Sequence, residues 1–337
     1  MKKLGYDVYC IAPNDDEVAL KAVTDVGVSV LPVKQASPIM LIVPMNLQAL
    51  KILYSKYSDT VFVCHFVVTA IIMAPSLFLA RRVVCVVEGI GTAFSKRKFL
   101  KKLLKFILGC LASKRVFMND YERDEIGSND DLVLGGIGVD LEKFKPAVRT
   151  LKNERDNINL LYVGRLVRDK GVYDLFILMR MLQENGVSFT MNIVGETYAG
   201  NYGSLQPEEL CQAQEEFGQS LVFHGQLQSV TRLYQETDLF LLLSRHEGFP
   251  VCVMEANACG RPVFAYDVPG CAHAIKDSVN GRLFPLGEVN SIAEAIVSGQ
   301  FISMRESARK YAENHFDRNV KADELISVIE TLASSNK

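Results

Sequence analysis

Glu247 and Glu255 are the residues whose types and spacing most clearly indicate chemistry. They lie eight positions apart in the segment RHEGFPVCVMEANACG, residues 245–260. Carboxylates accept hydrogen bonds from neighbouring hydroxyl groups, and free amides at a helix N-terminus bind anions such as phosphate. Two glutamates near a helix start are also common as solvated charges, so the spacing alone leaves both interpretations open.

The surrounding residues predict a strand, a loop and a helix that would position these groups. The apolar run TDLFLLLS, residues 237–244, is typical of a buried parallel strand. Pro250 suits the first helical position, and the helix is expected to end at Gly260. Glu247 is then expected in the loop after the strand, and Glu255 about one turn into the helix. The amides expected at the helix N-terminus belong to Gly248, Phe249, Val251 and Cys252.

The string EGFP, followed by a second glutamate, resembles the donor-site segment of glycosyltransferase family 4, whose members are retaining enzymes with the GT-B fold. The resemblance implies that Glu247 faces the donor sugar and that Glu255 holds the ribose hydroxyls of a nucleotide diphosphate sugar. It favours a uridine nucleotide as co-substrate and no cofactor. We find no Asp-x-Asp pair to hold a divalent cation on the diphosphate, so we expect no metal.

A second motif, LLYVGRLVRDKG over residues 160–171, has two cations on a short loop. A strand is expected to end at Gly164, where the missing side chain would let a ligand approach the backbone. Arg165 and Lys170 follow, and they resemble the arginine and lysine of the family's donor loop. Fixed cations there would stabilise a departing diphosphate, which gains negative charge as the glycosidic bond breaks. The alternative is a solvated loop with chance charges.

Three weaker segments also resemble the family. VGE around Gly195 and FHGQL around Gly225 are similar to segments that border the nucleotide base, which implies backbone contacts with the donor there. LGGIGVDLEKFKP, residues 134–146, resembles the stretch that closes the family's first lobe. Its glycines lack the spacing of a dinucleotide-binding loop, so we expect a tight turn in which Asp140 caps the following segment.

Glu88 is a candidate catalytic residue in the first half of the chain. It lies in VVEGIGTAF, residues 86–94, directly after an expected strand. The family often has a histidine at this position, lining the cleft opposite the donor. Glu88 is therefore a candidate to orient or deprotonate the acceptor hydroxyl. A glutamate at a strand end is also common as an ordinary hydrogen-bond acceptor, and both interpretations stay open.

Residues 94–114, FSKRKFLKKLLKFILGCLASK, form a candidate amphipathic helix. Its cations are Lys96, Arg97, Lys98, Lys101, Lys102 and Lys105. In one interpretation the apolar residues cover a core and the lysines form a solvated face. In the other the helix docks on an anionic membrane surface, where each cation contributes on the order of 1 kcal/mol. Nucleic-acid binding is disfavoured because no arginine-rich or aromatic stacking platform accompanies the cations.

Composition and charge indicate a globular cytoplasmic chain. Its 337 residues allow two domains, and 49% of them are hydrophobic and 23% charged. The eight cysteines include no CxxC pair and fit a reducing cytosol. Residues 1–150 have 20 lysines and arginines against 15 acids, whereas residues 151–337 have 17 against 24. The excess positive charge belongs to the first half, which allows peripheral association with the inner face of the membrane.

One uncharged segment, residues 61–80, has the length of a membrane span. His65 and Pro75 favour instead a buried strand followed by a buried helix. The chain also begins without an apolar stretch of the kind that forms a signal peptide.

Apolar runs alternate with amphipathic stretches, which is typical of an α/β fold with parallel sheets. With the family resemblance, this pattern predicts a GT-B fold: two Rossmann-like lobes with a cleft between them. The expected parts are an acceptor-side lobe (1–150), a donor lobe (151–304) and helices that cross back to the first lobe (305–337). Strands are expected at residues 6–12, 61–66, 83–87, 115–118, 132–134, 159–163, 190–194, 221–223, 239–243, 262–266 and 281–284.

The start of the chain leaves two functional hypotheses. In the family a strand, a glycine-rich loop and a helix precede the segment that GYDVYCIAP, residues 5–13, resembles, so we expect these elements to be absent here. The first hypothesis is a retaining hexosyl- or N-acetylhexosaminyltransferase with a lipid-linked or polysaccharide acceptor in bacterial surface glycan synthesis. The second is a shortened protein that binds a nucleotide sugar without transferring it.

Overall fold

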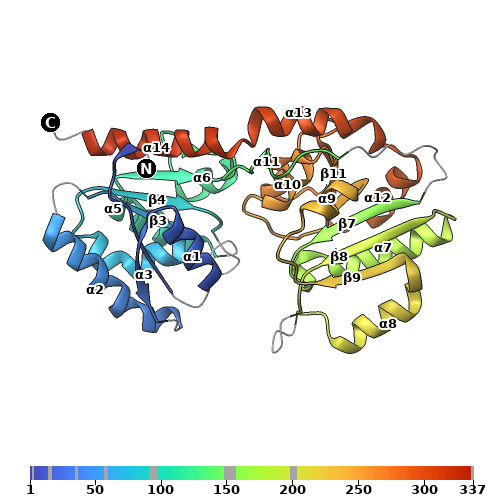
Figure 1. Cartoon of the computed structure of the whole chain (residues 1–337), viewed down its shortest axis with the longest axis horizontal. Helices are drawn as coiled ribbons and strands as arrows, with labels where there is room; N and C mark the ends of the chain where they lie inside the picture. The colour runs from blue at the N-terminus through green and yellow to red at the C-terminus, as the bar shows by residue number, and fades with distance from the viewer. Residues whose placement is uncertain are drawn as a thin grey trace. The chain divides into compact units, whose positions relative to one another are not determined.

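The computed structural model describes residues 1, 4–13, 17–34, 37–56, 60–90, 97–147, 157–197 and 203–334. Contacts divide the chain into two compact units, both visible in Figure 1. Unit 1 comprises Met1–Leu134 and Asp323–Lys337, and unit 2 comprises Gly135–Ala322. Each unit is built on parallel strands, which confirms the α/β class expected from the sequence.

The strands of unit 1 form two separate parallel sheets. One has the order β1-β2 and the other β3-β4-β5-β6, and in the described part of the unit no strand pairing joins them. Strand β4, VVCVV, is buried along its whole length, as its unbroken apolar run predicts. Strand β2 escaped prediction because Pro32 interrupts its short apolar run. The strands are β1 (Tyr9–Pro13), β2 (Ser29–Val33), β3 (Phe62–His65), β4 (Val83–Val87), β5 (Lys114–Phe117) and β6 (Leu132–Val133).

The helices of unit 1 alternate with these strands. The uncharged residues 61–80 form β3 and α3, as predicted, and among the described residues no helix has the length and apolar character that crossing a membrane requires. Helix α3 contacts both α2 and α5. The helices are α1 (Glu17–Asp25), α2 (Pro38–Lys56), α3 (Val67–Leu77), α5 (Lys98–Leu111) and α6 (Asp120–Ile126). The last helix of the chain, α14 (Arg318–Ser334), begins in unit 2 and ends in unit 1.

Unit 2 contains one six-stranded parallel sheet with the order β12-β11-β10-β7-β8-β9. The chain builds outward from β7 through β8 to β9, then returns to the other side of β7 and continues from β10 to β12. The direction of building therefore reverses between β7 and β10, the place where ligands bind in open parallel sheets. The strands are β7 (Ile158–Val163), β8 (Phe189–Val194), β9 (Leu221–Gly225), β10 (Leu239–Leu242), β11 (Val263–Tyr266) and β12 (Gly281–Phe284).

Helices lie between the strands of unit 2, and the sheet supplies its core. Strands β10 and β11 are buried at every residue, and α7 and α12 pack against each other. The helices are α7 (Val172–Glu184), α8 (Pro207–Phe217), α9 (Thr231–Glu236), α10 (Val251–Ala258), α11 (Pro269–Ala274), α12 (Val289–Val297) and α13 (Arg305–His315).

The boundary between the units lies after Leu134, earlier than the expected division at residue 150. Side chains of unit 2 hold the segment that follows. The guanidinium of Arg309 donates to the carbonyl oxygen of Phe144 at 3.0 Å, and the Phe144 ring meets Tyr234 edge-on. The polar residues that suggested a later boundary therefore did not mark it.

The end of the chain also differs from the expected separate segment 305–337. Helix α13 packs on α10, and Ala308 and Ala312 are fully buried there, so α13 belongs to unit 2. The chain joins unit 1 only from Asp323.

The structure predicts that Asp238→Ala strongly destabilises unit 2. The Asp238 carboxylate is fully buried, pairs with Arg305 at 2.5 Å and accepts the Asn159 amide at 2.9 Å. Removing one partner of a buried pair leaves the other charge unbalanced, so we expect a loss of about 3 kcal/mol in the free energy of unfolding. Urea denaturation followed by circular dichroism measures this. Asp267→Ala, at an exposed position, is the control and should change stability by less than about 0.5 kcal/mol.

Candidate functional site

An ion pair joins the two sequence motifs of unit 2. The Lys170 Nζ atom lies 2.7 Å from the Glu247 Oε1 atom, and the side chains are 21% and 12% exposed. Lys170 follows β7 and Glu247 follows β10, so the two residues meet where the sheet reverses its direction of building. Sequence analysis predicted both residues but not their contact, because they are 77 positions apart.

Close backbone packing holds the two loops together. Gly171 has φ +77°, and a Cβ atom there would lie 2.0 Å from the Leu243 carbonyl oxygen. The Arg245 amide donates to the Asp169 carbonyl oxygen at 2.9 Å. Because only glycine fits at residue 171, the loop that contains Lys170 can approach the end of β10.

A buried carboxylate also fixes the loop before Glu247, and sequence analysis missed it. Asp174, on α7, accepts the Tyr266 hydroxyl at 2.9 Å and pairs with Arg245 at 3.1 Å. Its side chain is 12% exposed. The signal in the sequence was an aspartate inside the otherwise apolar start of α7, VYDLFILM.

Glu255 lies in the second turn of α10, as predicted. The helix begins at Val251, so Pro250 occupies the N-cap position rather than the first helical position, and Gly260 with φ +69° follows its end. Burial raises the pKa of Glu255, and the nearby Tyr234 hydroxyl and Lys143 partly offset this rise. A partly desolvated carboxylate gains from hydroxyl donors, so Glu255 suits a hydroxylated ligand.

Cys252 lies among the charged groups of the site. Burial raises the pKa of its thiol, the carboxylates of Glu247 and Glu255 raise it further, and Lys170 lowers it. Both glutamates and the lysine therefore act electrostatically on the Cys252 thiol, at the start of α10. The thiol is protonated in this setting and acts as a small packing group.

The predicted donor glycines cluster at neighbouring strand ends. The Gly195 amide donates to the Gly225 carbonyl oxygen at 2.9 Å. A Cβ atom at Gly195 would lie 1.9 Å from the Gly164 carbonyl oxygen, and one at Gly164 would lie 2.8 Å from the Tyr162 hydroxyl. Close contacts within the protein therefore favour glycine at residues 164 and 195. Approach of a ligand to the Gly164 backbone stays a prediction.

The remaining predicted donor residues differ in what they present. Arg165 is exposed and, within the described part of the chain, forms no ion pair. The Phe249 ring packs on Phe316, with centroids 6.1 Å apart, and fills the space beside Gly136. Its side chain is therefore structural. Val251 is 41% exposed at the start of α10.

Gly270, on α11, supports the loop from the opposite side and was not predicted. A Cβ atom there would lie 2.4 Å from the Glu247 carbonyl oxygen and 2.5 Å from that of Gly248. The sequence signal was the pair Pro269-Gly270, which opens a short helix directly after β11. Gly270 therefore allows α11 to pack directly against the backbone of the loop that holds Glu247.

In unit 1, Glu88 pairs with His65, which the sequence had not indicated as a site residue. The His65 Nδ1 atom lies 2.5 Å from the Glu88 Oε1 atom, and the side chains are 50% and 20% exposed. His65 ends β3 and Glu88 follows β4, so both lie at the carboxyl edge of that sheet. The pairing fits an orienting role and an ordinary hydrogen bond equally well.

Glu122, on α6, is a buried carboxylate beside the same loop. It accepts the Ile90 amide at 2.9 Å, and its second carboxylate oxygen has no partner among the described residues. Burial raises the pKa of Glu122 to about 7, although the amides of Ile90 and Gly89 lower it.

The basic segment forms α5, and five of its six predicted cations lie within the described residues, with Lys96 outside them. Lys101 pairs with Glu125 on α6. The other four are exposed: Arg97, Lys98, Lys102 and Lys105.

Asp140 lies in the turn that follows Gly138, where the sequence predicts a cap. Asp140 accepts the amides of Glu142 and Lys143, each at 3.0 Å, which confirms the predicted cap. In the part of the chain that the structure describes, no group of three His, Cys, Asp or Glu side chains is placed to hold a metal ion.

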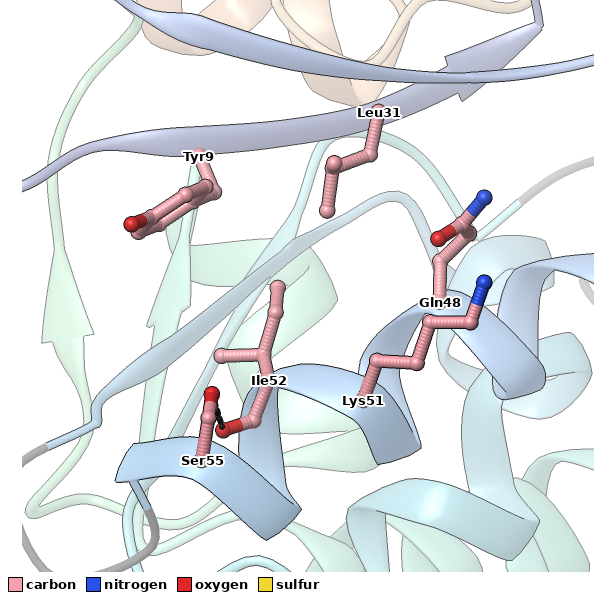
Figure 2. Close-up of a pocket in the computed structure, with 6 residues that line it drawn as sticks. All are labelled: Tyr9, Leu31, Gln48, Lys51, Ile52 and Ser55. Carbon is pink, nitrogen blue, oxygen red and sulfur yellow. Dashed lines mark hydrogen bonds between the residues drawn. The ribbon is translucent and has the colours of Figure 1, made fainter.

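Figure 2 shows a pocket of about 170 Å³ between the β1-β2 sheet and α2, outside every predicted site. Its lining residues are Tyr9, Leu31, Gln48, Lys51, Ile52 and Ser55.

The two parallel-sheet units define a GT-B class of α/β protein, and solved structures share the fold. The crystal structure of Anabaena Alr3699/HepE in complex with UDP has a TM-score of 0.76 at 18% identity, covering 94% of this chain and 90% of that one. Sucrose-phosphate synthase from Thermosynechococcus elongatus has a TM-score of 0.78 at 17% identity, covering 99% and 91%.

Sequence comparison then assigns the family. Residues 145–318, more than half of the 337-residue chain, match the family described as Glycosyl transferases group 1. The chain belongs to this family. The matched segment contains Arg165, Lys170, Glu247 and Glu255.

Curated relatives include enzymes whose names describe lipid-linked sugars. One is an N,N'-diacetylbacillosaminyl-diphospho-undecaprenol alpha-1,3-N-acetylgalactosaminyltransferase of Campylobacter jejuni, 26% identical over 62% of this chain and 59% of its own length. Another is a UDP-Gal:alpha-D-GlcNAc-diphosphoundecaprenol alpha-1,3-galactosyltransferase of Escherichia coli, 26% identical over 64% and 59%. The matches therefore span less than two thirds of these relatives.

We predict that Gly270→Ala displaces the loop that holds Glu247. The added Cβ atom would overlap two backbone oxygens, so the loop must move, at a cost of about 2 kcal/mol in the free energy of unfolding. Urea denaturation followed by circular dichroism measures this loss. Gly109→Ala, on α5, is the control because nothing lies closer than 3.9 Å to its Cβ position, so it should cause no such loss. Unchanged stability of the Gly270 variant would contradict this role.

Glu122 predicts a pH dependence for unit 1. The folded chain keeps the Glu122 proton up to a pKa of about 7, whereas the usual value is 4.5. The folded state thus binds more protons between these values, so this group lowers stability as pH rises from about 5 to about 8, by up to about 3 kcal/mol. Glu122→Gln should remove that slope. Hydrogen exchange of the β4 and α6 amides at several pH values measures it, and equal slopes in both proteins would contradict the assignment.

Proposed function

We propose that the chain is a retaining glycosyltransferase that transfers a hexosyl or N-acetylhexosaminyl group from a nucleotide diphosphate sugar, with uridine as the base. The observation that supports this most directly is the Lys170–Glu247 pair at the point where the unit 2 sheet reverses its direction of building. A cation and a carboxylate in contact there suit the two ends of such a donor: the diphosphate and the sugar hydroxyls.

In the proposed donor complex the diphosphate lies between the cations and the start of α10. Arg165 and Lys170 neutralise its charge, and the amides of Gly248, Phe249, Val251 and Cys252 add the positive end of the helix dipole. Glu255 accepts hydrogen bonds from the ribose hydroxyls, and Glu247 faces the donor sugar. Backbone contacts with the base involve the glycine cluster at the ends of β8 and β9.

The proposed reaction joins the acceptor to the face from which the diphosphate leaves. The acceptor hydroxyl oxygen bonds to the anomeric carbon as the bond to the diphosphate oxygen breaks, and the electron pair of that bond goes to the diphosphate. The acceptor proton passes to the departing diphosphate. Arg165 and Lys170 stabilise the growing negative charge, so the proposal needs no metal. Glu88, held by His65, is proposed to orient the acceptor hydroxyl.

The proposed acceptor is a lipid-linked or polysaccharide sugar in bacterial surface glycan synthesis. The names of the Campylobacter and Escherichia relatives support this, since both describe diphospho-undecaprenol sugars. We further propose that the enzyme works in the cytoplasm, at the inner face of the membrane, where it would meet a lipid-linked acceptor.

The donor half of this proposal predicts distinct effects for three substitutions. Arg165→Ala and Lys170→Ala should each weaken UDP binding about 10- to 100-fold, because each removes a charge-assisted contact with the diphosphate. Glu247→Gln should leave UDP affinity within about threefold but lower sugar transfer about 100-fold or more. Calorimetry with UDP and release of UDP from UDP-sugars, with an undecaprenyl-diphosphate-linked acceptor, measure the two effects. Lys276→Ala is a matched control at an exposed position.

Two outcomes would alter the proposal. Equal UDP affinity in the Arg165, Lys170 and Lys276 variants would contradict the donor site. Tight binding of UDP-sugars with no transfer by the unmodified chain would favour the second hypothesis, a protein that binds a nucleotide sugar without transferring it.

A further inference from the structure

The solvent face of α5 has two parallel stripes of different chemistry. Phe99, Leu103 and Phe106 are 75%, 44% and 69% exposed. Lys98, Lys102 and Lys105 are also exposed, each one position before an apolar residue. Both sets follow the i, i+4, i+7 spacing of one helix face, so the stripes run side by side along the helix.

The core of unit 1 does not use these aromatic residues. Leu104, Leu108 and Leu111 are 1%, 0% and 5% exposed and form the buried face of α5. Sequence analysis offered core coverage as one role for all the apolar residues of this segment. The leucines of the buried face fill this role, whereas Phe99 and Phe106 do not cover the core.

The charges around α5 leave its exposed stripe positive. Lys101 is paired with Glu125 on the neighbouring helix α6. Two further acids of α6, Asp120 and Asp124, both pair with Arg123. Among the described residues, no ion pair involves Lys98, Lys102 or Lys105. These acids of α6 are therefore paired with Lys101 and Arg123 rather than with the exposed lysines of α5.

Helix α2 adds a second exposed apolar stripe in the same unit. Its segment Pro38–Lys56 contains no acidic residue. Its exposed apolar residues at helical spacing are Ile39 (80%), Val43 (66%), Leu47 (54%), Leu50 (38%) and Tyr54 (96%). Helix α3 contacts both α2 and α5, and the three helices can be followed within unit 1 in Figure 1. Exposed apolar stripes of this length are rare on monomeric proteins and usually mark an interaction surface.

We propose that α5 docks unit 1 on an anionic phospholipid surface. In this arrangement Lys98, Lys102 and Lys105 contact the lipid headgroups, and Phe99 and Phe106 enter the interface. Charge complementarity favours this partner. The lysines match the anionic headgroups, and the neighbouring aromatic side chains match the apolar layer beneath them. This inference rests on the proposed function. If the acceptor is lipid-linked, docking on the membrane would bring the chain to it.

Vesicle co-sedimentation of the full chain tests this docking. We expect binding to vesicles of phosphatidylcholine mixed with phosphatidylglycerol, weak binding to phosphatidylcholine alone, and weaker binding as salt increases. The triple variant Lys98→Gln/Lys102→Gln/Lys105→Gln should lower the partition coefficient about 100-fold. The double variant Phe99→Ser/Phe106→Ser should lower it about tenfold or more.

Two control variants remove the same number of charges and of exposed apolar side chains from other positions. Lys34→Gln/Lys145→Gln/Lys276→Gln removes three exposed lysines elsewhere, and Leu286→Ser/Val297→Ser removes two exposed apolar residues of unit 2. Both should bind vesicles like the unmodified chain. Equal losses in the α5 triple variant and its control would contradict the proposal, as would binding that ignores lipid charge. Self-association of the chain through α2 without vesicle binding would also overturn it.

The docking and the transfer can fail separately. UDP affinity, measured without vesicles, should be the same for the α5 variants and the unmodified chain. Vesicle binding without sugar transfer would leave the docking in place and refute the proposed function. Transfer to a lipid-linked acceptor in vesicles that the chain does not bind would refute the docking alone.

Discussion

The candidate site depends on close approach of two loops, at the ends of β7 and β10. Lys170 reaches Glu247 because Gly171 allows the first loop to lie against the Leu243 backbone. The same approach brings Lys170 within electrostatic range of Cys252, at the start of α10. The parallel sheet contributes the geometry, since its reversal of building direction leaves adjacent strand ends with diverging connections. Lys170, the N-terminus of α10 and the carboxylates of Glu247 and Glu255 therefore belong to one site.

Small residues and buried polar groups maintain that approach. Gly195 and Gly270 each face a backbone oxygen at a distance that no side chain would tolerate. Asp174 holds Arg245 and Tyr266, and so fixes the chain just before Glu247. The candidate site is therefore built largely from backbone contacts within unit 2. Unit 1 differs: its strands form two sheets, its helices expose apolar stripes, and Glu122 is a buried carboxylate with a raised pKa.

The sequence predicted the parts that depend on local pattern and missed those that depend on tertiary contact. Buried strands such as β4 and β10 follow from unbroken apolar runs, and the position of Glu255 follows from the helix that begins after Pro250. The unit boundary was missed because packing by Arg309 and α13, rather than composition, decides it. Gly270 and Asp174 were missed because their partners are distant in sequence. The contact between Gly164 and the Tyr162 hydroxyl was also missed, because it depends on the folded positions of both residues.

The central claim is that the loops after β7 and β10 bind a nucleoside diphosphate. A crystal structure of the chain with UDP tests it most directly. The account predicts diphosphate oxygens within hydrogen-bond distance of Arg165 and Lys170, ribose hydroxyls on Glu255, and the base beside the glycines that end β8 and β9. UDP bound away from these strand ends, or a diphosphate that contacts neither cation, would contradict it.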